Sequence, residues 1–131
     1  MFLFLRFTKL FLLRFSELFP RVNTLIYRKR GVRVEQEILC SIRQAKNGDK
    51  EALIQLIMSQ KEDYYRLAYV YMKDQEDALD AMSDMIVIVF ENIKSLKMEG
   101  AFFSWSKTIL VNCCKQHLRK KRKIILLQEL P

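Results

Sequence analysis

The spacing of apolar residues predicts helices along most of the chain from Glu35 onward. Apolar side chains recur every three or four positions, the spacing that places them on one face of an α-helix. The clearest run lies within 75–94, at Ala78, Met82, Met85, Val89 and Ile93. The same pattern predicts helices at about 35–46, 50–72 and 102–123. Since no segment alternates with a period of two, we predict an all-α fold, a compact bundle of about four helices.

Short polar segments between these runs predict where the helices begin and end. Asn47 and Gly48 tolerate the left-handed conformation that commonly ends a helix, so they are expected to close the first one. Asp49 and Asp74 are good N-cap residues for the second and third helices, because an aspartate oxygen accepts a hydrogen bond from the first turn. The segment 95–100 is predicted to be a short loop before the last helix.

Composition agrees with this reading and excludes several kinds of site. The 131 residues amount to about one domain, and only three Gly and two Pro fit long helices. The cysteines (Cys40, Cys113 and Cys114) and the single histidine, His117, are too few and too scattered for a four-ligand zinc site. We therefore expect no metal and no cofactor, a reducing cytoplasmic location, and a surface position for His117.

Residues 1–33 form a hydrophobic and basic extension that is predicted to lie outside the native domain, with a translation start at Val32 or Val34 as one explanation. Arg6, Lys9 and Arg14 interrupt its apolar residues, so it has no span of about 20 apolar residues for a transmembrane helix. Wound as a helix, it would gather phenylalanines on one side. An amphipathic helix on a membrane surface is the alternative for this segment.

Charge is distributed unevenly along the chain. The net charge is +6 over residues 1–35, −4 over residues 36–100 and +6 over residues 101–131. The last segment contains five consecutive basic residues, Arg119–Lys123. An acidic middle followed by a basic end indicates two different partners, one of which is anionic.

The predicted third helix carries an acidic stripe opposite its apolar face. Asp77, Asp80, Asp84 and Glu91 follow one another at spacings of 3, 4 and 7 residues. An ordinary solvated helix face is the simplest explanation of such a stripe. A docking surface for a basic partner is the functional explanation.

Three motifs in order resemble region 2 of bacterial RNA polymerase sigma factors of the extracytoplasmic-function subfamily. A G-D-x-x-A motif begins at Gly48, and the D-A-x-D part of a D-A-x-D-x-x-Q-x-x-F motif begins at Asp77. An F-x-x-W-x-x-x-I-x-x-N motif runs from Phe102 to Asn112 and leads into the basic run. Each motif alone is weak, but their shared order and spacing over about 38–125 are specific.

The chain also departs from this family at several positions. Ser83 stands where the family usually has Gln, Ile86 where it has Phe, and Ser106 where it has Leu after the Trp. The region 2 domain is predicted to span 34–125, with 126–131 as the start of a linker. No part of this sequence is expected to form the helix-turn-helix region 4 that reads the minus-thirty-five element, so a truncated product, a fragment and a one-domain variant all stay open.

The resemblance implies roles for residues on the third and fourth helices. The third helix would dock on a basic coiled coil in the clamp of the largest polymerase subunit. The fourth helix would bind and help open the minus-ten promoter element, with the loop at 95–101 helping to capture a flipped base. The implied polymerase-binding residues are Asp77, Asp80, Asp84 and Ser83. The implied DNA-binding residues are Phe102, Phe103, Trp105, Asn112, Lys115, Gln116, Arg119, Lys120, Arg122 and Lys123.

The expected function is therefore that of a transcription initiation factor, a sigma factor that acts by binding and is not an enzyme. Its expected partners are core RNA polymerase, promoter DNA and an anti-sigma factor, and we expect no membrane contact. Two alternatives stay open. One is a truncated or regulatory module that binds polymerase without full promoter activity; the other is a membrane-surface protein that uses the Phe-rich N-terminus.

Overall fold

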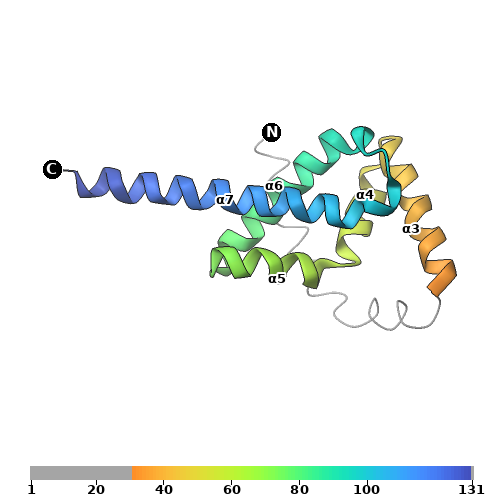
Figure 1. The fold of residues 1–131 in the computed structure, drawn as a ribbon, viewed down its shortest axis with the longest axis horizontal. Coiled ribbons are helices and arrows are strands. Elements are labelled where there is room, and N and C mark those ends of the chain that lie inside the picture. The colour runs from red at the N-terminus through yellow and green to blue at the C-terminus, as the bar shows by residue number, and fades with distance from the viewer. Residues whose placement is uncertain (1–30, 131) are drawn as a thin grey trace.

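The computed structural model describes residues 31–130, and this part of the chain contains α-helices, two short 3-10 helices and no strand (Figure 1). The predicted all-α fold is confirmed, and residues 31–130 contain five α-helices where about four were expected. The predicted N-terminal extension (1–33), with its alternative of an amphipathic membrane-surface helix, lies outside the described residues except for its last three, with which α3 begins. The α-helices are α3 (Gly31–Lys46), α4 (Lys50–Met58), α5 (Lys61–Met72), α6 (Gln75–Asn92) and α7 (Phe102–Glu129).

The predicted helix caps are confirmed. Asp49 Oδ1 accepts a hydrogen bond from the backbone N–H of Ala52 at 3.1 Å, at the start of α4. Asp74 Oδ2 accepts one from the N–H of Asp77 at 3.0 Å, at the start of α6. Gly48, between α3 and α4, has a φ of 99°, a conformation that glycine adopts with little strain. These local signals set where the helices begin.

The prediction of one continuous helix over 50–72 is wrong, because the chain breaks after Met58. The Ser59 hydroxyl donates to the carbonyl of Leu56 at 2.6 Å, and Ser59 N–H bonds to the carbonyl of Gln55. Serine competes in this way with the regular backbone ladder. The chain resumes as α5 at Lys61 in a new direction, so α4 packs with α3 while α5 packs against α6 and α7.

The five α-helices of the described residues all contribute to one core. Within it α5, α6 and the first half of α7 pack together, and α3 and α4 pair at one end of the molecule (Figure 1). The apolar positions predicted on the third helix are all buried, with at most 2% of each residue exposed. Their burial fixes the rotation of α6 about its axis. The same rotation decides which way the acidic residues of α6 point.

The last helix is longer than predicted, since α7 continues to Glu129 and does not stop at Lys123. From Arg119 to Leu130 every residue is exposed, and this end of α7 projects beyond the other helices (Figure 1). Four consecutive apolar residues, Ile124–Leu127, are more than half exposed. Consecutive helical residues are rotated by about 100°, so these four encircle the helix and do not form one apolar face.

A buried hydrogen bond accounts for one departure from the family pattern. Ser106 is fully buried, and its Oγ lies 2.6 Å from the hydroxyl of Tyr64 on α5. The Ser106 hydroxyl also donates to the carbonyl of Phe103 at 3.0 Å, which leaves the Tyr64 hydroxyl as the donor of the shorter bond. The serine that replaces the usual leucine therefore joins α5 to α7 through a polar contact inside the core.

Replacing Ser106 with the larger Leu is expected to lower the free energy of unfolding by about 1–3 kcal/mol, the usual cost of overpacking a filled core. Urea denaturation followed by circular dichroism measures the change. Ser104→Leu is the matched control, because Ser104 lies on the same helix and is exposed. Its effect should stay within about 0.5 kcal/mol. Equal denaturation midpoints for Ser106→Leu and the wild type would contradict the packing described for Tyr64.

Candidate functional site

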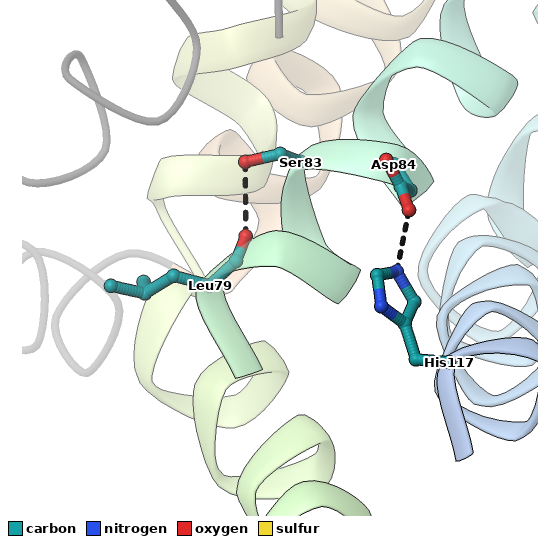
Figure 2. Close-up of polar contacts among 4 residues, drawn as sticks. All are labelled: Leu79, Ser83, Asp84 and His117. Atoms are coloured by element: carbon teal, nitrogen blue, oxygen red, sulfur yellow. Dashed lines mark hydrogen bonds and ion pairs between the residues drawn. The ribbon is translucent and has the colours of Figure 1, made fainter. Parts of the chain in front are cut away.

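Two carboxylates of the acidic stripe on α6 pair with side chains of α7. Asp84 Oδ2 lies 2.6 Å from Nε2 of His117, and Figure 2 shows the imidazole ring reaching from α7 to this carboxylate. Asp77, two turns earlier on α6, forms an ion pair with Lys121. The stripe is therefore not a simple solvated face, because the edge of it that carries Asp77 and Asp84 lies against α7.

The prediction that His117 is a surface residue holds only in part. Its side chain is 25% exposed and is held between α6 and α7. Hydrogen bonding to Asp77 raises the pKa of Lys121, and the charge of Asp74 acts in the same direction. His117 and Lys121 on this side of α7 thus face carboxylates of α6, and Lys121 also lies near the charge of the N-cap residue Asp74.

The remaining predicted polymerase-binding residues differ in their exposure. Asp80 lies partly exposed on α6, between the positions of Asp77 and Asp84. Ser83 is 3% exposed, and its hydroxyl donates to the carbonyl of Leu79 within the same helix at 2.9 Å (Figure 2). A buried serine that bonds its own helix offers no side-chain contact to a partner. Where the family usually has the long side chain of Gln, this chain therefore has a short side chain that stays inside the domain.

The cysteines of α7 lie in the core and do not form a reactive site. Cys113 and Cys114 are both buried. Burial, followed by the charge of Asp84, raises the pKa of the Cys113 thiol from 9.0 to about 11. Burial also raises the pKa of Cys114. Both thiols stay protonated near neutral pH, and a protonated thiol is a poor nucleophile and a poor metal ligand.

The predicted DNA-binding cations lie on α7, away from the core. The buried side of this helix carries Ser106, Leu110, Cys113 and Cys114. The opposite side presents exposed residues at spacings of three and four. These exposed residues are Thr108, Asn112, Lys115, Arg119 and Arg122, and we call this set the outer face of α7. Gln116, Lys120 and Lys123 are also exposed beside it, so the predicted cations share one accessible surface.

The aromatic residues at the start of α7 are not equally available to a ligand. Phe102 is fully buried and contacts the ring of Phe103, with centroids 5.4 Å apart in an edge-to-face arrangement. It also lies 6.2 Å from the ring of Trp105. The burial gives the Phe102 ring a place in the core with no exposed face, and its predicted contact with DNA stays a prediction. Phe103 and Trp105 pack against the core but keep partly exposed rings.

The loop before α7 is shaped by two 3-10 turns, η1 (Ile93–Ser95) and η2 (Glu99–Ala101). Leu96 is buried between them and holds the loop on the core. Arg43 Nε on α3 donates to Glu99 Oε2 at 3.1 Å, which ties η2 to α3. The loop is thus anchored at two points beside the first turn of α7.

The part of the chain that the structure describes supports neither a metal site nor a membrane-spanning helix. Within residues 31–130 there is no group of three or more His, Cys, Asp or Glu side chains placed to hold a metal ion. The helices of this same part lack the length and apolar character needed to cross a bilayer.

Sequence reasoning missed two residues of the site, His117 and Lys121. Both follow the buried positions Leu110 and Cys114 at helical spacing, so they continue the core-facing side of α7 beyond the core. The spacing of His117 and Lys121 from these apolar positions could have distinguished them, from sequence alone, from the residues of the outer face. The five basic residues Arg119–Lys123 therefore divide between two sides of the helix.

Comparison with known proteins gives a consistent assignment. The model of the sigma-70 region 2 family matches residues 56–124, slightly more than half of the chain. The RNA polymerase sigma factor SigV of Bacillus subtilis is 33% identical over 84 residues, which cover 64% of this chain and 51% of SigV. The ECF sigma factor SigM of Mycobacterium tuberculosis is 32% identical over 75 residues, which cover 57% of this chain and 38% of SigM.

A third relative, the ECF sigma factor SigW of Bacillus subtilis, is 27% identical over 89 residues, which cover 68% of this chain and 48% of SigW. The chain thus matches about half or less of the length of these curated relatives. No solved structure matches it significantly. The segment that the family model matches, residues 56–124, runs from the end of α4 to the exposed part of α7. It contains both the acidic residues of α6 and the outer face of α7. The chain therefore belongs to the sigma-70 region 2 family, within its extracytoplasmic-function branch.

Proposed function

We propose that this protein binds core RNA polymerase and the minus-ten element of promoter DNA, and helps to open that element at the start of transcription. The observation that carries the proposal is the outer face of α7. One helix places Asn112, Lys115 and Arg119 in solvent while its opposite side is fixed in the core. A rigid cationic helix face is suited to following the phosphates of a nucleic acid strand.

The proposed DNA contacts fall into two groups. Lys115, Arg119 and Arg122, with Lys120 and Lys123 beside them, would attract phosphates without regard to sequence. Phe103, Trp105, Asn112 and Gln116 would lie nearer the bases, because they precede the cationic end or stand at its start. Phe102 is left out of the proposal because its ring is buried.

The proposed polymerase contacts are Asp77, Asp80 and Asp84 on α6, toward a basic surface of the polymerase clamp. These carboxylates lie at the edge of α6 that is at least partly exposed. Charge complementarity of this kind increases the rate of association and fixes the orientation of the partners. Ser83 is left out because its hydroxyl is used inside the domain.

The direct test mixes the full chain with core polymerase and follows their co-elution on size-exclusion chromatography. The eluted complex is then titrated with a fluorescent promoter fragment whose minus-ten region is unpaired. We expect co-elution, and binding of the promoter about tenfold tighter than of a scrambled strand, since each wrong base in a recognised site costs about 1–3 kcal/mol. Absence of co-elution would refute polymerase binding, and equal affinity for both strands would refute promoter recognition.

A further inference from the structure

Two polar side-chain pairs between α6 and α7 involve the same carboxylates that the proposed function assigns to polymerase. Asp84 pairs with His117 and Asp77 with Lys121. We call these four residues the α6–α7 latch. Side chains of Asp77 and Asp84 are 24% and 39% exposed, so a partner can reach them from solvent.

We infer that the α6–α7 latch couples polymerase docking to DNA binding, because Asp77 and Asp84 cannot pair fully with α7 and with a basic partner surface at once. This inference rests on the proposed function. In the free protein the carboxylates hold Lys121 and His117 against α6. A basic surface that docks on α6 competes for the carboxylates and releases the two side chains of α7.

Release changes the electrostatics of the DNA-binding helix in two ways. Lys121 lies between Lys120 and Arg122 in the sequence but on the core-facing side of α7, so a freed Lys121 adds its charge beside the predicted cations. The carboxylates of Asp77 and Asp84, which repel phosphates from the side of α7, are neutralised by the partner. Both changes favour DNA, and binding of DNA must by linkage favour polymerase to the same extent.

The size of the coupling follows from the exposure of the pairs. A partly exposed ion pair contributes little, and one or two of them correspond to a coupling of about two- to tenfold. A coupling of this size does not endanger folding of the free protein, yet it changes the fraction of promoter DNA that is bound. The latch therefore acts as a bias and does not block DNA binding.

The test measures two affinities of the full chain with two double variants. Asp77→Asn/Asp84→Asn removes the carboxylates, and the free variant should bind a single-stranded promoter oligonucleotide about two- to tenfold tighter than wild type. The slope of log affinity against log salt should become steeper by about 0.7, because one phosphate contact is added. His117→Gln/Lys121→Met leaves the carboxylates without their partners in α7, so it should bind core polymerase about two- to tenfold tighter than wild type.

The matched control is Glu37→Gln/Glu51→Gln, which removes two negative charges from exposed positions on α3 and α4. It should leave DNA affinity nearer to wild type than the latch variant does. Thermal melting shows whether each variant folds. If a double variant does not fold, a single variant that breaks one pair, Asp84→Asn or Lys121→Met, takes its place. If the wild type binds polymerase and DNA but the latch variants match the control, the latch is refuted alone. Failure of the wild type to bind polymerase, or of its polymerase complex to bind the promoter strand, would refute the proposed function and the latch with it.

Discussion

Replacing Arg119, Lys120 and Arg122 together with alanine is expected to weaken binding of the promoter strand by the polymerase complex about 100-fold at 0.1 M salt. Each lost phosphate contact removes about 0.7 from the slope of log affinity against log salt on single strands. Three contacts thus remove a slope of about 2, which corresponds to that loss at 0.1 M. Fluorescence anisotropy at several salt concentrations measures both the affinity and the slope.

The control for this triple variant is Lys46→Ala/Lys61→Ala/Arg66→Ala, which removes the same charge from α3 and α5. If only total positive charge mattered, both variants would lose the same DNA affinity. If the cations of α7 contact phosphates, the α7 variant should lose much more. The assay includes polymerase, because a free domain of this kind is expected to bind DNA weakly. Unchanged affinity at two salt concentrations would mean that the basic end of α7 is only a solvated surface.

Reversing two charges on α6, with Asp80→Lys/Asp84→Lys, is expected to abolish co-purification with core polymerase. The substitutions turn an attractive surface into a repulsive one, and like charges across an interface cost several kcal/mol. The proposed basic surface of the clamp then meets two lysines. A pull-down with tagged polymerase measures the loss.

Glu51→Lys/Glu62→Lys is the charge-matched control for this reversal, since both glutamates are exposed on α4 and α5. Circular dichroism must show that the α6 variant keeps its helices, because Asp84 also pairs with His117. If a folded Asp80→Lys/Asp84→Lys protein is still retained by polymerase, then α6 is not the docking surface.

Local signals in the sequence predicted much of the fold. The caps at Asp49 and Asp74 and the left-handed Gly48 depend on a few neighbouring residues, and all three were found as expected. The break at Ser59 was missed because the apolar spacing continues across it. The end of α7 was missed because Ile124–Leu127 suggested a linker, whereas leucine, glutamine and glutamate in 126–129 favour helix even without a core beneath them.

The candidate site was less accessible to sequence reasoning because it depends on how helices pack. A charge count identified Asp77 and Asp84 but could not show that α7 supplies Lys121 and His117 as their partners. The family motif suggested Phe102 as a DNA contact, and only the packing of the core shows that its ring is covered. Ser106 was recognised only as a departure from the family. Its bond to Tyr64 appears once α5 and α7 are placed together.

The projecting end of α7 has a mechanical consequence. Residues 119–129 continue the helix by about 16 Å beyond the packed part, at a rise of about 1.5 Å per residue. A rigid arm of this length turns a tilt of about 10° at its base into a displacement of about 3 Å at its tip. Lys121 and its ion pair with Asp77 lie close to the base of that arm. Small adjustments between α6 and α7 are therefore magnified at Glu129, so this helix can act as a lever.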